Sequence, residues 1–252
     1  MLVTKDDAFG FSQAFGVEMH TELRVLCGFE VRVGGRFVSL PSNVERILAL
    51  LAVRSRPQPR LHVASTLWMD TTEDRAAANL RTALWKARQS LGECIDVRGN
   101  HLTLAPGIDV DLATVVERAG RLLDDDADLP PDQCDPAELA GDLLPDWDED
   151  WIVFERERLR QLRIHALESL CRKLSAAGRA GRAIDAGLAA VAAEPLRESA
   201  QRVLIAAHLH EGNVSEARRQ YHCYRELLWD SLGIEPSETL RLLVGLAGAA
   251  PR

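Results

Sequence analysis

The chain has 252 residues, of which 46% are hydrophobic and 27% are charged, as expected of a globular protein with one large or two modest domains. No apolar run approaches the roughly 20 residues that cross a membrane, and the N-terminus lacks the basic-then-apolar order of a secretory signal, so we expect a cytoplasmic protein with no membrane partner. The net charge of −8 gives no overall attraction to nucleic acid, and the five cysteines, which form no C-x-x-C pair, indicate neither a disulfide framework nor a zinc knuckle.

The N-terminal part predicts a flexible extension followed by a small sheet. Residues 1–21 show no clear periodicity, and we expect them to form a flexible N-terminal extension. From Glu22 to Leu40, apolar residues alternate with polar ones, and Gly34-Gly35 marks a tight hairpin. This pattern predicts a small antiparallel β platform.

Two helices are predicted after the platform. Ser42-Asn43-Val44-Glu45 has the sequence of a capping box, and the apolar spacing behind it predicts a helix that runs to about Arg54. The proline-rich segment 56–59 must turn, because the residue before a proline disfavours the helical conformation. A short second helix then places Leu61, Ala64, Leu67 and Trp68 on its inner face.

The segment from Arg75 to Leu91 predicts an amphipathic helix with a basic outer face. Its apolar stripe comprises Leu80, Ala83, Leu84, Ala87 and Leu91, and no carboxylate occurs between Arg75 and Leu91. Arginine, lysine, threonine and glutamine side chains facing away from a packed stripe are able to reach phosphates and base edges in a DNA major groove. A solvated surface helix is the alternative interpretation.

A hairpin after this helix gives the pattern a structural context. Strands at Ile95–Val97 and Leu102–Leu104 flank a Gly-Asn turn, and segment 108–112 closes the module. The order of sheet, two helices, longer helix and hairpin is that of a winged helix-turn-helix, with the hairpin as the wing. We expect base or groove contacts from Arg75, Asn79, Thr82, Lys86 and Gln89, and contacts to the DNA backbone or flanking groove from Arg81, Arg88, Arg98 and Asn100. Asn79, Arg81 and Arg88 could instead serve the fold, and Trp85 could pack against the second domain or a neighbouring protomer.

A helix at 112–123 leads to an acidic run in which Asp124, Asp126 and Asp128 imitate the start of an EF-hand. Leu129 stands where that loop needs a glycine, so we predict a solvated linker.

From Trp151 onward the pattern is helical and repeats. Gly178 and Gly212 are related by the 34-residue tetratricopeptide period, and the same offset relates Ala183 to Ala217. We expect two antiparallel helical units, capped by helices at 151–177 and 237–246, that offer a concave surface to a protein partner. His208, His210, His222 and Cys223 do not share one helix face, so we expect no metal site.

The charges are divided unevenly between the two predicted domains. Residues 20–115 hold 12 Lys and Arg against 10 Asp and Glu, whereas residues 116–252 hold 17 against 25. A winged helix at 22–115 joined to an all-α, tetratricopeptide-like domain at 116–252 gives a mainly α fold with a small β platform. The chain contains no phosphate loop, no strand-linked dinucleotide motif, no nucleophile elbow and no H-E-x-x-H motif, so we expect neither an enzyme nor a cofactor.

Both halves resemble the Streptomyces antibiotic regulatory proteins. The stretches that resemble that family's OmpR-like DNA-binding domain are Leu40–Leu51, Arg60–Trp68 and Ala76–Trp85. Those that resemble its bacterial transcriptional activation domain are Gly141–Pro145, Trp147–Trp151, Glu155–Arg160, Pro195–Ala200, Glu211–Asn213, Tyr221 with Tyr224, and Leu232–Pro236.

The resemblance implies a transcription factor, usually an activator, that binds direct repeats in double-stranded promoter DNA and contacts RNA polymerase or its sigma factor. We expect it to act as a homodimer on DNA. Two departures from the family pattern matter. The segment Lys86–Gln89 is less basic than the R-L-R-R run of many members, and no nucleotide-binding domain follows, so ATP dependence is not expected. The alternative is a tetratricopeptide-like adaptor whose winged helix no longer binds DNA.

Overall fold

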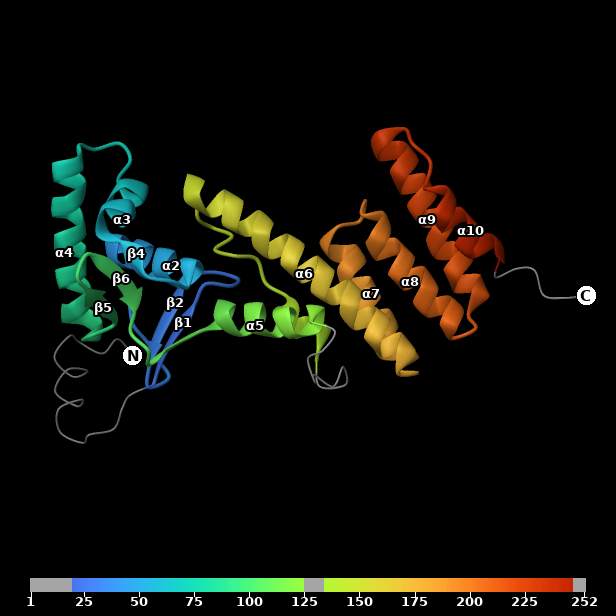
Figure 1. The fold of residues 1–252 in the computed structure, drawn as a ribbon, viewed down its shortest axis with the longest axis horizontal. Helices are drawn as coiled ribbons and strands as arrows, with labels where there is room; N and C mark the ends of the chain where they lie inside the picture. Colours follow the sequence, from blue (N-terminus) through green and yellow to red (C-terminus); the bar gives the residue numbers. More distant parts are fainter. Residues whose placement is uncertain (1–19, 125–133, 247–252) are drawn as a thin grey trace, which may run out of the picture. The chain divides into compact units, whose positions relative to one another are not determined.

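The computed structural model describes residues 20–124 and 134–246, and the chain divides into two compact units (Figure 1). The first unit runs to Thr114 and also contains Asp142–Glu155, and the second contains Val115–Gly141 and the chain from Arg156 onward. The predicted extension lies outside the described residues except for His20 and Thr21, of which Thr21 already belongs to a strand.

The platform of the first unit is a four-stranded sheet. It consists of β1 (Thr21–Arg24), β2 (Glu30–Val33), β3 (Arg36–Phe37) and β7 (Ile108–Val110) in the order β3-β2-β1-β7. The predicted hairpin joins β2 to β3, with Gly34 and Gly35 at φ 56° and 76°, a conformation that glycine adopts without steric cost. The sheet is not wholly antiparallel as predicted, because β7 pairs parallel to β1.

The first unit also contains the predicted three helices and wing. They are α2 (Ser42–Arg54), α3 (Arg60–Leu67), α4 (Glu73–Leu91), β5 (Ile95–Arg98) and β6 (His101–Leu104). A strand that the sequence did not predict, β4 (Gln58–Pro59), pairs with β6 and completes a three-stranded sheet in the order β4-β6-β5. Buried residues of all three helices and of β6 form one core, so the winged helix-turn-helix fold is confirmed.

The predicted capping box of α2 is wrong. Pro41 is the N-cap residue, with an extended backbone at φ −63° and ψ 142°, and no side chain caps the helix. The hydroxyl of Ser42 therefore lies within the first turn instead of at the cap, although Glu45 still faces the positive end of the helix dipole.

Segment 142–155 belongs to the first unit, although the sequence pattern predicted that all residues after 115 form one C-terminal domain. Leu143 pairs with Leu26 in an isolated β-bridge and is buried. The Trp147 ring lies 5.5 Å from that of Phe29, and Trp151 packs against the core that α4 shares with α2 and α3. The boundary differs from the prediction because these apolar side chains are buried by residues more than 70 positions earlier, which local periodicity does not reveal.

Two ion pairs hold the same segment against α2. Arg46 on α2 binds both carboxylate oxygens of Glu149, at 2.6 and 3.0 Å, and also donates to the carbonyl oxygen of Leu67 at the end of α3. Arg54 lies 2.7 Å from Glu155, whose side chain is only 5% exposed. Because a buried carboxylate without a partner is costly, each arginine helps to fix the path of the segment.

We predict that Leu143→Ala destabilises the first unit by about 3 kcal/mol, as is typical of truncating a buried leucine. Hydrogen exchange of the β1 amides should accelerate, while the amides of the C-terminal helices keep their protection. Val153→Ala is the matched control in the same segment, because Val153 is 62% exposed. Equal acceleration in both units after Leu143→Ala would contradict the assignment of this segment to the first unit.

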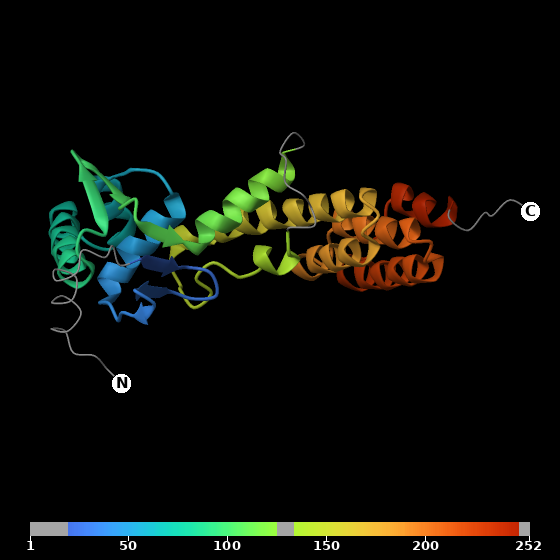
Figure 2. The same ribbon diagram turned by 90° about the horizontal axis from the view of Figure 1, so that it is seen from below.

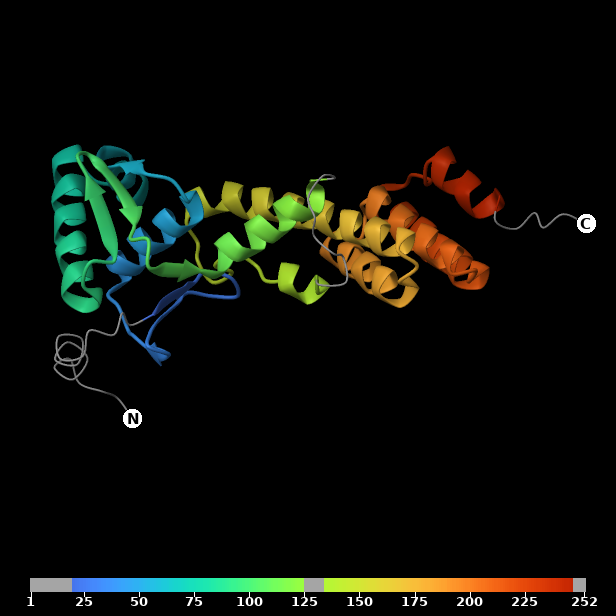
Figure 3. The same ribbon diagram turned by 60° about the horizontal axis from the view of Figure 1, so that its bottom comes forward.

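The second unit is helical in every described element. Its elements are α5 (Asp111–Leu123), which begins in the first unit, η2 (Pro136–Leu139), α6 (Asp150–Ala176), which also crosses the division, α7 (Ala180–Ala193), α8 (Glu198–His210), α9 (Val214–Leu232) and α10 (Glu238–Leu246). Helices α7, α8 and α9 are joined by short connections and lie side by side (Figures 1 and 3). This arrangement confirms the tetratricopeptide-like fold.

The 34-residue repeat of the sequence is visible in the backbone. Gly178 and Gly212 both have positive φ, 71° and 85°, immediately before α7 and α9. Ala183 and Ala217, five residues later in each helix, are both fully buried. Gly187 lies so close to Leu204 of α8 that a Cβ atom there would come within 3.1 Å of the leucine side chain. The small residues of the repeat therefore serve close helix packing.

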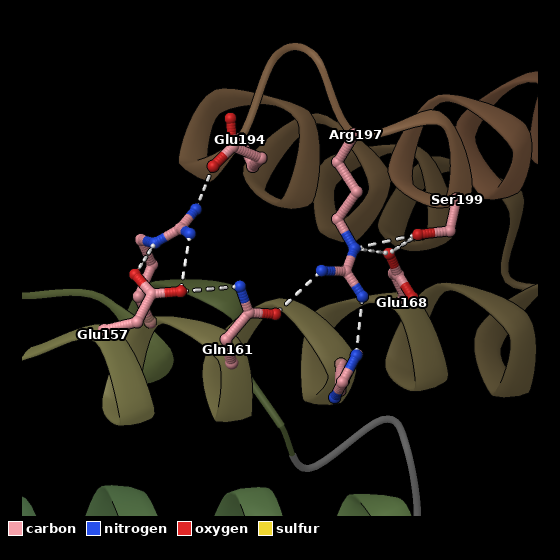
Figure 4. Close-up of polar contacts among 8 residues, drawn as sticks. Glu157, Gln161, Glu168, Glu194, Arg197 and Ser199 are labelled. Atoms are coloured by element: carbon pink, nitrogen blue, oxygen red, sulfur yellow. Dashed lines mark hydrogen bonds and ion pairs between the residues drawn. The ribbon is translucent and has the colours of Figure 1, made fainter. Parts of the chain in front are cut away.

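A polar network joins α6 to the turn between α7 and α8 (Figure 4). Arg197 donates to Glu168 on α6 at 3.0 Å, to Gln161 at 2.9 Å and to the hydroxyl of Ser199 at 2.9 Å. Its remaining nitrogen lies 2.6 Å from a ring nitrogen of His165. The Glu168 side chain is only 6% exposed, and it also accepts a hydrogen bond from Ser199. A planar guanidinium is suited to such a site, because its donors are held in one fixed fork.

We predict that Arg197→Ala destabilises the second unit by about 3 kcal/mol, because it leaves the buried Glu168 carboxylate without its cation. Arg197→Lys should recover only part of the loss, since an ammonium group cannot reproduce the fork. Thermal unfolding checks both variants. Arg202→Ala on α8 is the control, because Arg202 is exposed. An unchanged melting temperature for Arg197→Ala would contradict the structural role of the network.

The remaining expectations concern metal sites, membrane-spanning helices, the acidic linker and the cysteines. Residues 20–124 and 134–246 contain no group of three or more His, Cys, Asp and Glu side chains that could hold a metal ion, and none of their helices is long and apolar enough to cross a membrane. The predicted acidic linker after Asp124 falls in 125–133, outside the described residues. All five cysteines are free; Cys94, Cys134 and Cys171 are buried, whereas Cys27 and Cys223 are exposed.

Candidate nucleic-acid interface

The orientation of α4 is fixed by the residues that it buries. Ala76, Leu80, Ala83 and Ala87 recur on one side of the helix and are at most 3% exposed. Leu80 and Ala83 belong to the core shared with α2, α3 and β6. The opposite face of α4 is therefore presented to solvent, and Figure 3 shows β5 and β6 alongside the helix.

The structure places most of the predicted contact residues on exposed surfaces. Those that are exposed are Arg75, Arg81, Thr82, Arg88 and Gln89 on α4, Arg98 at the end of β5 and Asn100 in the turn of the wing. Asn79 and Lys86 are instead half-buried. Lys86 lies about 60° around the helix axis from the buried Ala83, at about 100° per residue. Lys86, an expected groove contact, therefore does not point fully outward, because it lies at the edge of the apolar stripe.

Two of the arginines have carboxylate partners within the module. Arg88 lies 2.8 Å from Glu93, and Arg98 lies 2.8 Å from Asp96 on the same strand. Both arginine side chains are more than 70% exposed, so these pairs are weak and phosphates could displace the carboxylates. In the part of the chain that the structure describes, Arg75 and Arg81 form no ion pair.

The wing is anchored to the helical core by backbone hydrogen bonds. Strand β6 lies between β5 and β4, and the amide of Arg60, the first residue of α3, donates to the carbonyl oxygen of Asn100 at 2.8 Å. The hairpin is seen from a second direction in Figure 2, in green. Its turn contains Gly99 at φ 59°, a left-handed backbone conformation that residues with a side chain rarely adopt. The tip of the wing and the start of α3 are thus held together.

A groove of about 590 Å³ separates the C-terminal half of α4 from β5. Arg60, Arg81, Trp85 and Arg88 line it together with residues 94–97. Arg60 and Trp85 were not among the predicted contact residues. The spacing of Trp85 from Arg81 and Arg88, four and three residues, gave a signal for the tryptophan, but nothing in the sequence placed Arg60 beside them.

The comparisons with known proteins agree with this architecture. The family model of the bacterial transcriptional activator domain matches residues 135–244. The regulatory protein AfsR of Streptomyces griseus is 25% identical over 219 residues, and that of Streptomyces coelicolor is 27% identical over 215 residues. These alignments cover 82% and 81% of this chain but only 22% and 21% of the relatives, so the chain spans about a fifth of the length of the relatives that it matches.

The fold of most of the chain is similar to that of a solved structure. EmbR of Mycobacterium tuberculosis, solved in complex with a low-affinity phosphopeptide, superposes with a TM-score of 0.74 at 22% identity. The match covers 91% of this chain and 65% of EmbR. Residues 135–244 of this chain are therefore a bacterial transcriptional activator domain.

Several of the motifs identified in the sequence have a structural explanation. The matched activator domain includes 142–155, yet this segment packs in the same unit as α4, where Trp151 contacts the common core. Arg197 and Ser199 of the Pro195–Ala200 motif, with Arg160 of the Glu155–Arg160 motif, belong to the polar network of α6. Arg160 bonds both Glu157 and Glu194. These motif residues therefore hold the helical unit together.

Proposed function

We propose that this chain is a sequence-specific transcriptional regulator, an activator that binds direct repeats in double-stranded promoter DNA and contacts RNA polymerase or its sigma factor. The observation that carries the proposal is the outward face of α4, where exposed arginine, threonine and glutamine side chains stand beside an anchored wing. Such a regulator acts in the cytoplasm, where bacterial promoters are found.

In the proposed complex, α4 lies in the major groove and the wing follows the flanking backbone. Arg75, Thr82 and Gln89 are exposed and suited to base edges, while Asn79 and Lys86 reach the groove from the side of the helix. Arg81 and Arg88, on the side of α4 that lines the groove toward β5, and Arg98 with Asn100 on the wing, contact phosphates.

The proposal also includes a homodimer on DNA. One module presents few basic side chains, and two of them already have carboxylate partners. A second protomer on the neighbouring repeat doubles the number of phosphate contacts and so raises affinity without new contacts within each module. The activator domain of residues 135–244 supports contact with the transcription machinery, as in the family to which it belongs.

A second candidate function is a tetratricopeptide-like adaptor that binds proteins and no DNA. The pairing of Arg88 with Glu93 and of Arg98 with Asp96 favours this alternative, because it lowers the positive charge available to phosphates. The two functions differ in whether the chain binds DNA with an affinity that falls as the salt concentration rises.

We predict that the full chain binds the DNA upstream of the genes that it regulates, with an affinity that falls steeply as salt rises. Each phosphate neutralised contributes a slope of about −0.9 in log K against log salt, so a dimer with six to ten such contacts loses about 10³- to 10⁵-fold between 50 and 200 mM salt. A gel-shift series at several salt concentrations measures the slope. Absence of retained DNA even at low salt would favour the adaptor.

We further predict that Lys86→Ala and Arg98→Ala each weaken binding, and that the melting temperature of Arg98→Ala stays unchanged because its side chain is exposed. Arg98→Ala should weaken binding to all DNA sequences equally. It should also reduce the slope of log K against log salt by about one for each protomer bound, as expected for the loss of one phosphate contact. Lys86→Ala should also reduce sequence preference. Arg36→Ala on β3, an exposed arginine of the platform sheet, is the control for the charge change. Wild-type binding by either variant would remove that residue from the interface.

A further inference from the structure

Trp85 is a large aromatic side chain in the middle of the solvent-exposed face of α4. Its side chain is 63% exposed. At about 100° per residue, it lies about 140° to 180° around the axis from each of the four buried residues, Ala76, Leu80, Ala83 and Ala87. The side chain therefore projects away from the core. Exposed tryptophans at the centre of a surface are characteristic of binding contacts, since they bury much area with few rotatable bonds.

The neighbours of Trp85 are cationic. Arg81 and Arg88 lie one turn before and one turn after it on α4, and Arg60 lines the same groove from the start of α3. Thr82 and Gln89 stand one turn away on its other side and are exposed. An indole ring framed by guanidinium groups fits a polyanion that also offers apolar surface. A second copy of this positively charged face would instead meet like charge.

Double-stranded DNA provides such an apolar group at one position. In the major groove, base edges present hydrogen-bond donors and acceptors, and the C5-methyl group of thymine is the apolar exception. An indole at the centre of a helix in that groove is suited to cover this methyl group, while the flanking arginines contact the phosphates on either side.

We propose that Trp85 is a specificity-determining residue that recognises thymine through its C5-methyl group. The inference rests on the proposed DNA-binding function and deepens it, because it assigns sequence preference to an apolar contact outside the polar and basic residues of α4. Burying one methyl group is worth about 0.8 kcal/mol, so replacing the contacted thymine by uracil should weaken binding by about four-fold.

The test uses the full chain and a duplex selected by the wild-type protein from a random pool. Each thymine of the selected site is replaced in turn by deoxyuridine, which removes only the methyl group, and affinity is measured at fixed salt. We expect one thymine in each half-site at which the wild type loses about four-fold. In Trp85→Ala the same replacement should have no measurable effect, and Trp85→Phe should keep part of the discrimination.

Two controls separate this contact from other causes. Phe37→Ala removes an equally exposed aromatic side chain, at 65%, from β3 of the platform and should keep the full response to uracil. Unchanged melting temperatures for the Trp85 variants would exclude a folding effect, as their exposure predicts.

The failures of the inference and of the proposed function are distinguishable. A wild-type chain that selects a sequence but responds to uracil as Trp85→Ala does would overturn the role of Trp85 and leave DNA binding intact. Equal loss of affinity by Trp85→Ala on all sequences would overturn it too, and would indicate a contact with sugar or phosphate. A wild-type chain that selects no sequence and shows no salt-dependent binding would reject the proposed function itself.

Discussion

The packing of Leu80 and Ala83 on α4 against Ile47 on α2 and Val63 on α3 decides which side of α4 faces solvent. The outward face follows from this single constraint, because residues on a helix have fixed angular positions once one stripe is buried. The core also includes Leu102 on β6. The same contacts that orient the helix therefore orient the wing, so the candidate interface is assembled by the core and not by its own side chains.

Segment 142–155 adds to this core from far along the chain. Trp151 packs against it, and Glu149 holds Arg46, which in turn bonds the carbonyl oxygen at the end of α3. The connection between α3 and α4 starts at that point. A family motif that lies within the activator domain by sequence thus stabilises the part of the chain that presents α4.

The polar residues of the second unit have a comparable structural role. Arg197 and Arg160 use charged hydrogen bonds to join α6 to the turn between α7 and α8, while small residues such as Gly187 let α7 and α8 approach closely. Repeat units of this kind bury their apolar faces only against their neighbours. Side chains that fix the turns therefore fix the stacking of the helices.

The sequence by itself determined the order of the main helices and hairpins, the winged helix, the 34-residue repeat and the activator-domain motifs, because these depend on local periodicity, turn glycines and motif order. It also identified most of the exposed residues of α4, since a helix of known phase has a known outer face. It did not predict the parallel pairing of β7, the third strand beside the wing or the groove that joins Arg60 to Trp85, because these depend on contacts between distant residues. Only the tertiary structure showed that 142–155 belongs with α4, that the Lys86 side chain is half-buried, and that Arg88 and Arg98 have carboxylate partners. Burial and ion pairing depend on which residues meet in the folded chain, and the spacing of residues along the sequence does not specify those contacts.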